Sequence, residues 1–281
     1  MRLVFVHGRG QGESSSEKLR DKWLEALEAG CRSAGVSLAD PLDLGVPFYG
    51  RALDEATAEV PVKAIIRGSD EAPDPVEEEL LLELAARAEI TDEEISEELA
   101  EPVVARKPEN WRWVLAAGRL LSRRFPSLGE DFIRRFTADV HAYLHWPHAR
   151  NPVNKLFIDE CGDGPTVVVS HSLGTIVAYW ALAEHKAPPP VPLFVTLGSP
   201  LGIEAIKRRL PRPVGKPSCV KIWLNAADVR DPVALFARLD RDTFPAQIEN
   251  LSDVHNPKDN PHAITGYLAD CTVAARIMGA L

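Results

Sequence analysis

A serine between two small residues is the first candidate for chemistry in this chain. The string "TVVVSHSLGT" (166–175) ends a run of β-branched residues at a turn, and the apolar stretch "IVAYWALAEH" follows at once. A sharp strand-to-helix turn lifts its middle hydroxyl, here that of Ser172, clear of the sheet, and it requires small residues such as Ser170 and Gly174 two positions away. A serine hydroxyl becomes a nucleophile when a histidine takes its proton and a carboxylate orients that histidine. The alternative interpretation is that Ser172 only caps a structural helix.

The segments around this turn alternate between strand and helix patterns. Short apolar runs predict buried strands within 2–12, 166–170, 193–202, 219–228 and 246–253, and a weaker short strand within 39–50. Helical patterns occupy 13–35, 138–146, 151–162, 173–185 and the end of the chain from 262. The helix at 151–162 is expected to begin with Asn151 as its cap and Pro152 in its first position. This alternation predicts an α/β fold with a mostly parallel central sheet and helices on both faces.

Residues 51–135 interrupt the alternation and predict an inserted helical cap, with the α/β core formed by 1–50 and 136–281. Between 71 and 101 the sequence has thirteen acidic residues and one arginine, whereas the helical stretch 109–125 is basic. Such segregation is typical of solvated faces, or of acidic and basic helices that lie side by side. Trp111 and Trp113 belong to this block, where they can line an apolar acyl pocket, touch a membrane surface or pack in the core.

The turn at Ser172 resembles the nucleophile elbow of the α/β-hydrolase superfamily, with Ser170 in place of the usual first glycine. The strings "DPVA" (231–234) and "LFVTLGSPLG" (193–202) are similar to segments of its lipase-like members. The resemblance covers the predicted core and leaves the insertion without a recognisable motif. It implies an α/β-hydrolase fold and a serine hydrolase mechanism in which the acid and then the histidine follow the serine along the chain.

This chain order limits the search for the acid and the base to the residues after Ser172. By the resemblance, the acid is Asp231 in preference to Asp228, although either can instead form a turn or cap a helix. The base is His262, on a loop before the closing helix, and His255 is the alternative.

Stabilisation of an oxyanion requires backbone N–H groups near the reacting carbonyl. The resemblance assigns this role to the N–H of Leu173, at the start of the helix, and to that of Arg9 in "VFVHGRGQG", with Gly10 as the alternative. This glycine-rich turn lacks both the GxGxxG spacing and the Gly-Lys-Ser ending of phosphate-binding loops. No cofactor is therefore expected. His141, His145 and His148 have a spacing that metal sites use, but no acidic residue or cysteine completes the set, so no metal is expected either.

Composition narrows the class of protein. The chain has 281 residues and a formal net charge of −9, which disfavours nucleic acid as a partner. Four widely spaced cysteines, an opening without a signal-peptide pattern and the lack of a long apolar run predict a cytoplasmic protein without a transmembrane segment.

Together these features predict a serine hydrolase, similar to lipases and esterases, that cleaves a carboxylic ester through an acyl-enzyme. The substrate is expected to be a small-molecule or lipid acyl ester, and peripheral contact with a membrane is compatible with this reading. A thioesterase or peptidase with the same triad, and a binding protein that keeps the hydrolase fold without turnover, are the alternatives.

Overall fold

The structure, a computed structural model, describes residues 1–8, 15–58, 75–100, 111–126 and 129–281. It has an α/β fold built on one six-stranded sheet in the order β2-β1-β3-β4-β5-β6, in which every neighbouring pair is parallel. The strands are β1 (Arg2–Val6), β2 (Asp43–Gly45), β3 (Thr166–His171), β4 (Val191–Leu197), β5 (Val220–Ala226) and β6 (Glu249–Leu251). The predicted α/β class and parallel sheet are thus confirmed, including the weak strand within 39–50.

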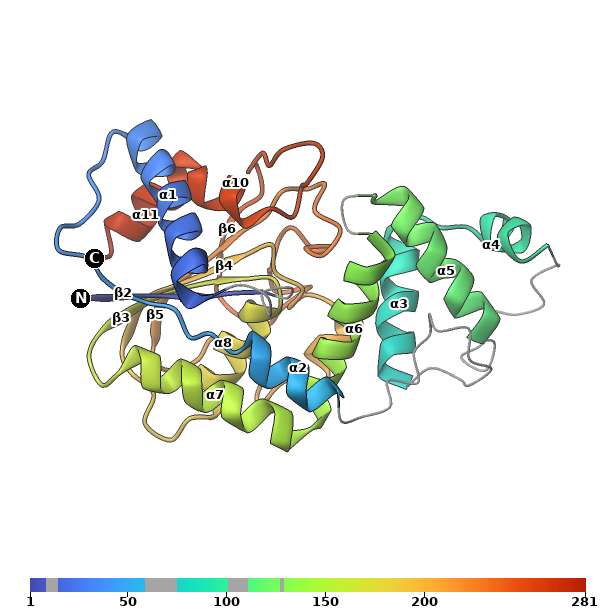
Figure 1. The fold of residues 1–281 in the computed structure, drawn as a ribbon, viewed down its shortest axis with the longest axis horizontal. Coiled ribbons are helices and arrows are strands. Elements are labelled where there is room, and N and C mark those ends of the chain that lie inside the picture. Colours follow the sequence, from blue (N-terminus) through green and yellow to red (C-terminus); the bar gives the residue numbers. More distant parts are fainter. Residues whose placement is uncertain (9–14, 59–74, 101–110, 127–128) are drawn as a thin grey trace.

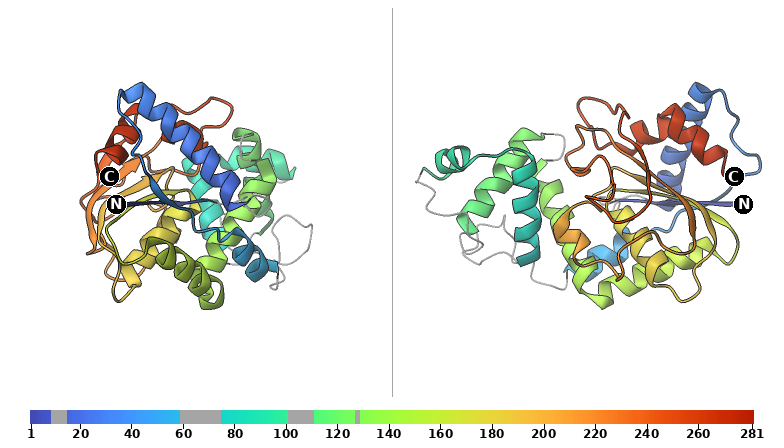
Figure 2. Two further views of the ribbon diagram at one scale, coloured as in Figure 1. Left: turned by 60° about the vertical axis from the view of Figure 1, so that its left-hand side comes forward. Right: turned by 180° about the vertical axis from the view of Figure 1, so that it is seen from behind.

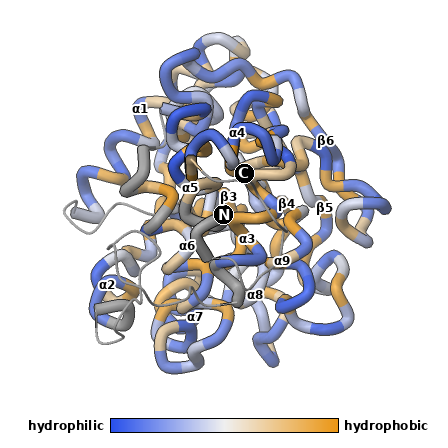
Figure 3. Tube along the Cα trace, turned by 90° about the vertical axis from the view of Figure 1, so that its right-hand side faces the viewer, coloured by the Kyte–Doolittle hydropathy of each residue, from blue (hydrophilic) through white to orange (hydrophobic). Residues whose placement is uncertain are grey.

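Helices cover both faces of this sheet, and each face has its own hydrophobic cluster. Leu3, Phe5 and Val169 point to one side, whereas Val4 and Val168 point to the other, as the two-residue period of a strand requires. The first side is covered by α1 (Ser16–Ala34), α10 (Ile264–Ala269) and α11 (Cys271–Met278). The second is covered by α2 (Gly50–Ala58), α7 (Pro147–Cys161), α8 (Leu173–Glu184) and the short α9 (Glu204–Lys207). The views in Figures 1 and 2 show these layers, and hydrophobic segments concentrate around the strands in Figure 3.

The strand order reverses between β1 and β3. From β1 the chain crosses to β2 through α1 on one face, and it returns to β3, on the other side of β1, through helices that lie on the opposite face or in the insertion. In open parallel sheets, ligands bind outside the carboxyl ends of the strands at such a switch point. The residues that follow β1 and β3, namely Gly8 and Ser172, lie at this point.

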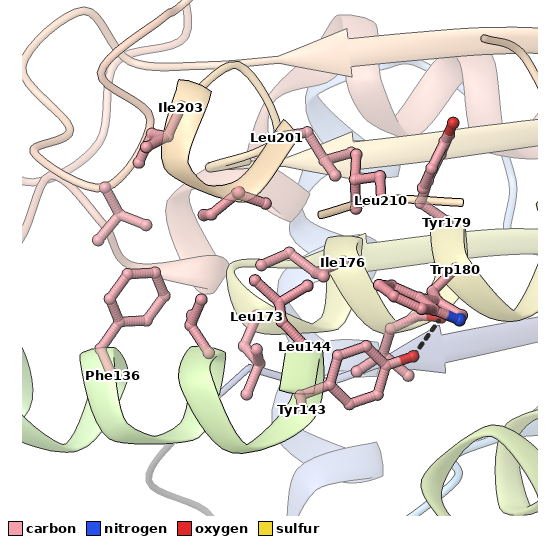
Figure 4. Close-up of a cluster of buried hydrophobic side chains, with 14 of the residues drawn as sticks. Phe136, Tyr143, Leu144, Leu173, Ile176, Tyr179, Trp180, Leu201, Ile203 and Leu210 are labelled. Atoms are coloured by element: carbon pink, nitrogen blue, oxygen red, sulfur yellow. Dashed lines mark hydrogen bonds between the residues drawn. The ribbon is translucent and has the colours of Figure 1, made fainter. Parts of the chain in front are cut away.

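Within the predicted insertion, α2 lies with the body, whereas the helices from residue 75 onward stand to one side of the sheet, with α6 (Gly129–His145) between them and the body (Figure 1). We call α3 (Pro75–Arg87), α4 (Asp92–Leu99), α5 (Trp111–Arg124) and α6 (Gly129–His145) the cap. Buried residues of the cap join the same hydrophobic cluster as α7 and α8. Tyr143 and Leu144 of α6 thereby pack against α8, which begins with Leu173, whereas Phe136 lies farther along α6 (Figure 4).

The charge segregation of the insertion reflects helix pairing. Glu98 of α4 accepts hydrogen bonds from Arg119 and Arg123 of α5, and Glu94 pairs with Arg124. The expectation that acidic and basic helices lie side by side is therefore confirmed for α4 and α5.

Several helix boundaries differ from the sequence prediction. The helix expected over 138–146 is α6, which begins at Gly129 and so crosses the predicted end of the insertion at residue 135. The helix expected to begin after Asn151 begins at Pro147, so Pro147 rather than Pro152 occupies the first turn and Pro152 lies inside α7. The closing helix is divided at Asp270, whose side chain accepts hydrogen bonds from the backbone N–H groups of Thr272 and Val273 and so caps α11. Among the described residues, no helix combines the length and the apolar character needed to cross a membrane.

Candidate active site

Ser172 occupies a strained turn between β3 and α8. Its backbone has φ 56° and ψ −129°, an unfavourable combination for a residue with a Cβ. A Cβ on Gly174 would lie 2.3 Å from the carbonyl oxygen of Val6, and one on Gly8 would lie 2.8 Å from Ser172 Cβ. Close approach of β1 to this turn therefore requires both glycines. The Ser172 side chain makes no capping hydrogen bond, so its position at the start of α8 does not explain the choice of serine.

His262 and Asp231 are brought together from segments 31 residues apart. The Nδ1 atom of His262 lies 2.8 Å from Oδ2 and 2.9 Å from Oδ1 of Asp231, and both side chains are buried. Because a carboxylate can only accept, Nδ1 carries the proton and Nε2 is left as the basic nitrogen. This is the tautomer in which a histidine can take a proton at Nε2.

The Asp231 carboxylate is held by further donors. The backbone N–H groups of Val233 and Ala234 donate to Oδ1 at 2.8 and 3.2 Å, and the hydroxyl of Tyr267 donates to Oδ2 at 2.7 Å. Asp231 thus forms the turn that the sequence allowed as its alternative role, and it also orients His262.

The two alternatives for the acid and the base lie in other surroundings. Asp228 pairs with Arg230 and accepts a hydrogen bond from the backbone N–H of Asn256 at 2.8 Å. Although burial alone raises the pKa of Asp228, these hydrogen bonds lower it overall. His255 is exposed to solvent. The pair that contacts is therefore Asp231 with His262.

Several contacts place His262 beside the turn that carries Ser172. The Nε2–H group of His171, the residue before Ser172, donates to the His262 carbonyl oxygen at 3.0 Å, and the two rings lie 4.6 Å apart. The backbone N–H of Ser172 donates to Leu197, and the next residue, Gly198, lies against His262: a Cβ there would be 3.2 Å from His262 Cε1. On the other side, Phe132 of the cap meets the His262 ring edge to face at 5.7 Å.

Ser172 Oγ and His262 Nε2 are both buried, and neither has a hydrogen-bond partner among the described residues. An unpartnered buried polar atom costs on the order of 1–3 kcal/mol. No hydrogen bond joins the two atoms, but they belong to neighbouring segments, and one can lose a proton while the other can accept it.

The structure describes one of the two predicted oxyanion donors. Leu173 is the first residue of α8, so its N–H belongs to the group at a helix start without an intrahelical acceptor. Arg9 and its alternative, Gly10, lie outside the described residues.

Two further histidines surround the site, and burial keeps both of them neutral. Burial lowers the pKa of His7 to about 4, and its ring donates from Nδ1 to the Gly8 carbonyl while Nε2 accepts from the Tyr49 N–H. Burial, followed by the neighbouring His262, lowers the pKa of His171 well below its usual value. The contact of His171 with His262, and that of Tyr267 with Asp231, escaped the sequence analysis. The one signal for these residues in the sequence is position: His171 directly precedes Ser172, and Tyr267 follows closely after His262.

The other chemistry-bearing residues stay apart. Within the described ranges, no three His, Cys, Asp or Glu residues are grouped so that they could hold a metal ion. His145 instead accepts a hydrogen bond at 3.1 Å from Arg209. Cys31, Cys161, Cys219 and Cys271 are free thiols.

Comparison of the chain with family models, curated proteins and solved structures finds no significant match.

Proposed function

We propose that this chain is a serine hydrolase with an α/β-hydrolase fold, and that it cleaves a carboxylic ester through an acyl-enzyme. The observation that carries the proposal is the Asp231–His262 pair, which leaves His262 Nε2 free beside the strained turn of Ser172. The location of Ser172 at the switch point of a parallel sheet supports it further. The order of the three residues along the chain is also the order that this superfamily uses.

In the proposed reaction, Ser172 Oγ attacks the ester carbonyl carbon while His262 Nε2 takes the hydroxyl proton. Asp231 holds the ring in the required tautomer and stabilises the imidazolium that forms. The N–H groups of Leu173 and Arg9 would bind the oxyanion. The C–O bond then breaks as His262 returns the proton to the departing alkoxide. Water, activated by the same nitrogen, releases the acyl group from Ser172 as a carboxylic acid.

A small apolar cavity next to the site supports an apolar rather than a charged group beside the base. The cavity has a volume of about 20 Å³, which is room for about one water molecule and not for an acyl chain, and it lies between the cap and the turn that follows Asp231. Phe132, whose ring contacts His262, forms part of its wall. It is lined by Leu84, Leu121, Phe125, Phe132, Ile133, Phe136, Pro232 and Val233. A wall of this composition contributes affinity by excluding water from aliphatic or aromatic carbons.

Labelling with a fluorophosphonate tests the proposal, because the probe phosphorylates an activated serine. We expect the wild-type protein to react, with the label on the peptide that contains Ser172, and Ser172→Ala to remain unlabelled. Ser170→Ala is the matched control, since Ser170 is equally buried two residues away and its hydroxyl donates to the Val195 carbonyl at 2.9 Å. A wild-type protein that stays unlabelled, or a label retained in Ser172→Ala, would refute the assignment and favour a non-catalytic binding protein.

Parallel assays with p-nitrophenyl esters and acyl thioesters of matched chain length define the reaction class. We expect higher kcat/KM on the ester. Preference for the thioester, or turnover of peptides alone, would replace the esterase with the thioesterase or the peptidase.

A further inference from the structure

We infer that Tyr267 is a positioning residue of the proposed reaction, and that its hydroxyl fixes the carboxylate of Asp231 opposite His262. The inference rests on the proposed function and extends it to a residue outside the Ser-His-Asp set. Tyr267 lies on α10, three residues after Ile264 opens that helix, and its side chain is fully buried.

The direction of the hydrogen bond from Tyr267 is determined by its two partners. The backbone N–H of Asp228 donates to the Tyr267 oxygen at 3.0 Å, so this oxygen acts as the acceptor there. The single hydroxyl proton is left for Asp231 Oδ2, which lies 2.7 Å away and cannot donate when ionised. Burial, reinforced by the charge of Asp231, raises the pKa of Tyr267 well above its usual value. The hydroxyl therefore keeps its proton at any pH at which an imidazole base operates.

This hydrogen bond completes the set that prevents the carboxylate from turning. Oδ1 is held by the N–H groups of Val233 and Ala234, and Oδ2 by Tyr267, which leaves the edge facing His262 for the imidazole. The backbone of Gly198 packs closely beside Oδ2 and leaves no room for a side chain. A Cβ added to Gly198 would lie 2.7 Å from that oxygen and 3.1 Å from Tyr267 Cε2. A carboxylate fixed in this way keeps the His262 ring aligned for proton transfer throughout the cycle.

The hydrogen bond from the Tyr267 hydroxyl also reduces the negative charge of Asp231 that acts on His262. A donor on Oδ2 withdraws part of the negative charge that would otherwise stabilise the imidazolium of His262. The other titratable and charged groups near this pair, among the described residues, come from four segments. They are His171 of β3, Asp228 and Arg230 of the loop after β5, and Lys22 of α1 and His7 after β1, which both act through His171.

Tyr267→Phe tests the inference, because it removes the hydroxyl and keeps the ring. We expect kcat on a p-nitrophenyl ester to fall on the order of tenfold with KM nearly unchanged, as for the loss of one charge-assisted hydrogen bond that acts on the reaction. The acid limb of kcat/KM against pH should move to higher pH, because the Asp231 charge then stabilises the imidazolium more strongly.

Tyr179→Phe is the matched control. Tyr179 is also fully buried, and its hydroxyl accepts from a backbone N–H, that of Gly215 at 3.1 Å, remote from the triad. This variant should lose stability without a shift of the acid limb. Equal acid limbs in Tyr267→Phe and wild type, or an equal shift in Tyr179→Phe, would overturn the inference.

If Tyr267→Phe does not fold, a second replacement at the same position tests the inference. Site-specific 3-fluorotyrosine at position 267 keeps the ring and the hydroxyl, and its more acidic hydroxyl donates more strongly. The acid limb should then move to lower pH, and an unchanged limb would count against the role. Failure of the proposed function has a different signature, since wild-type protein would then neither hydrolyse esters nor react with the fluorophosphonate, and the inference would fall with it.

Discussion

Gly198 lies where a single added methyl group would meet the acid, the base and Tyr267 at once. Its backbone has φ +55°, and a Cβ would lie 2.7 Å from Asp231 Oδ2, 3.1 Å from Tyr267 Cε2 and 3.2 Å from His262 Cε1. The shortest of these distances has to grow by about 0.7 Å to reach ordinary van der Waals contact. We therefore expect Gly198→Ala to displace the carboxylate from His262.

The size of the effect follows from two separate costs. A non-glycine residue in left-handed backbone costs about 1–2 kcal/mol, and overpacking a tight site adds about 1–3 kcal/mol. Gly35, at the end of α1, has φ +69° and open space around its Cβ direction, so Gly35→Ala isolates the backbone cost. Gly198→Ala should accordingly lower the free energy of unfolding by about 2–5 kcal/mol, against 1–2 kcal/mol for Gly35→Ala.

The activity should separate the two variants more strongly than the stability does. Misplacement of a catalytic group by about 1 Å costs on the order of 100-fold in rate, so we expect kcat of Gly198→Ala to fall by about 10- to 100-fold and that of Gly35→Ala to stay near wild type. Urea unfolding followed by circular dichroism gives the stabilities, and hydrolysis of a p-nitrophenyl ester gives kcat. Equal kcat values in the two variants would refute the reasoning that Gly198 leaves room for the Asp231–His262 pair.

Three further predictions concern the acid, the pH response and the cap. Asp231→Asn should lower kcat by about 10⁴-fold, as expected when the base loses its orienting carboxylate, whereas Asp228→Asn should mainly lower the melting temperature; equal kcat losses would refute this division of roles. Because burial lowers the pKa of His7 to about 4, the folded protein resists a proton that the unfolded chain accepts below about 6.5. The free energy of unfolding should therefore keep its full value above that pH and fall by up to about 3 kcal/mol towards pH 4. In His7→Gln the fall should be shallower. Equal pH slopes of the two proteins in urea unfolding would contradict this prediction. Phe132→Ala should enlarge the apolar cavity and move the preferred p-nitrophenyl ester to a longer acyl chain, and an unchanged preference would separate the cavity from the acyl group.

The sequence predicted the parts of this structure that depend on local patterns. The buried run before Ser172 and the apolar helix after it are consecutive in the chain, so hydrophobic periodicity and small turn residues were sufficient to place β3 and α8. Acidic and basic runs likewise allowed two interpretations, solvated faces or helices side by side, and the second holds for α4 and α5.

Choices between similar neighbours rested on the resemblance to a family, because no local pattern in the chain decides them. Asp228 and Asp231 share one short loop, and only the fold shows that Asp228 meets Arg230 while Asp231 meets His262. Pro147 and Pro152 both suit the first turn of α7. Pro147 occupies it because Trp146 has the extended backbone of an N-cap. The contact between Tyr267 and Asp231 joins residues 36 positions apart, and no local pattern specifies it.

The distribution of satisfied and unsatisfied polar atoms is the strongest physical argument about what this chain is selected to do. At the carboxyl ends of β3 to β5, Ser170, His171, Asp231 and Tyr267 all use their polar atoms in hydrogen bonds. Folding alone would favour the same treatment for Ser172, where an alanine would avoid burying an idle hydroxyl. Yet Ser172 Oγ and His262 Nε2 have no partners in the part of the chain that the structure describes, and Ser172 also carries backbone strain. Stability is given up at these two atoms, which exchange a proton in the proposed mechanism, although no hydrogen bond joins them and Asn256 Oδ1 nearby is a third buried atom without a partner among the described residues. This combination supports the proposed hydrolase over the alternative of a scaffold, which gains nothing from an idle hydroxyl in strained backbone.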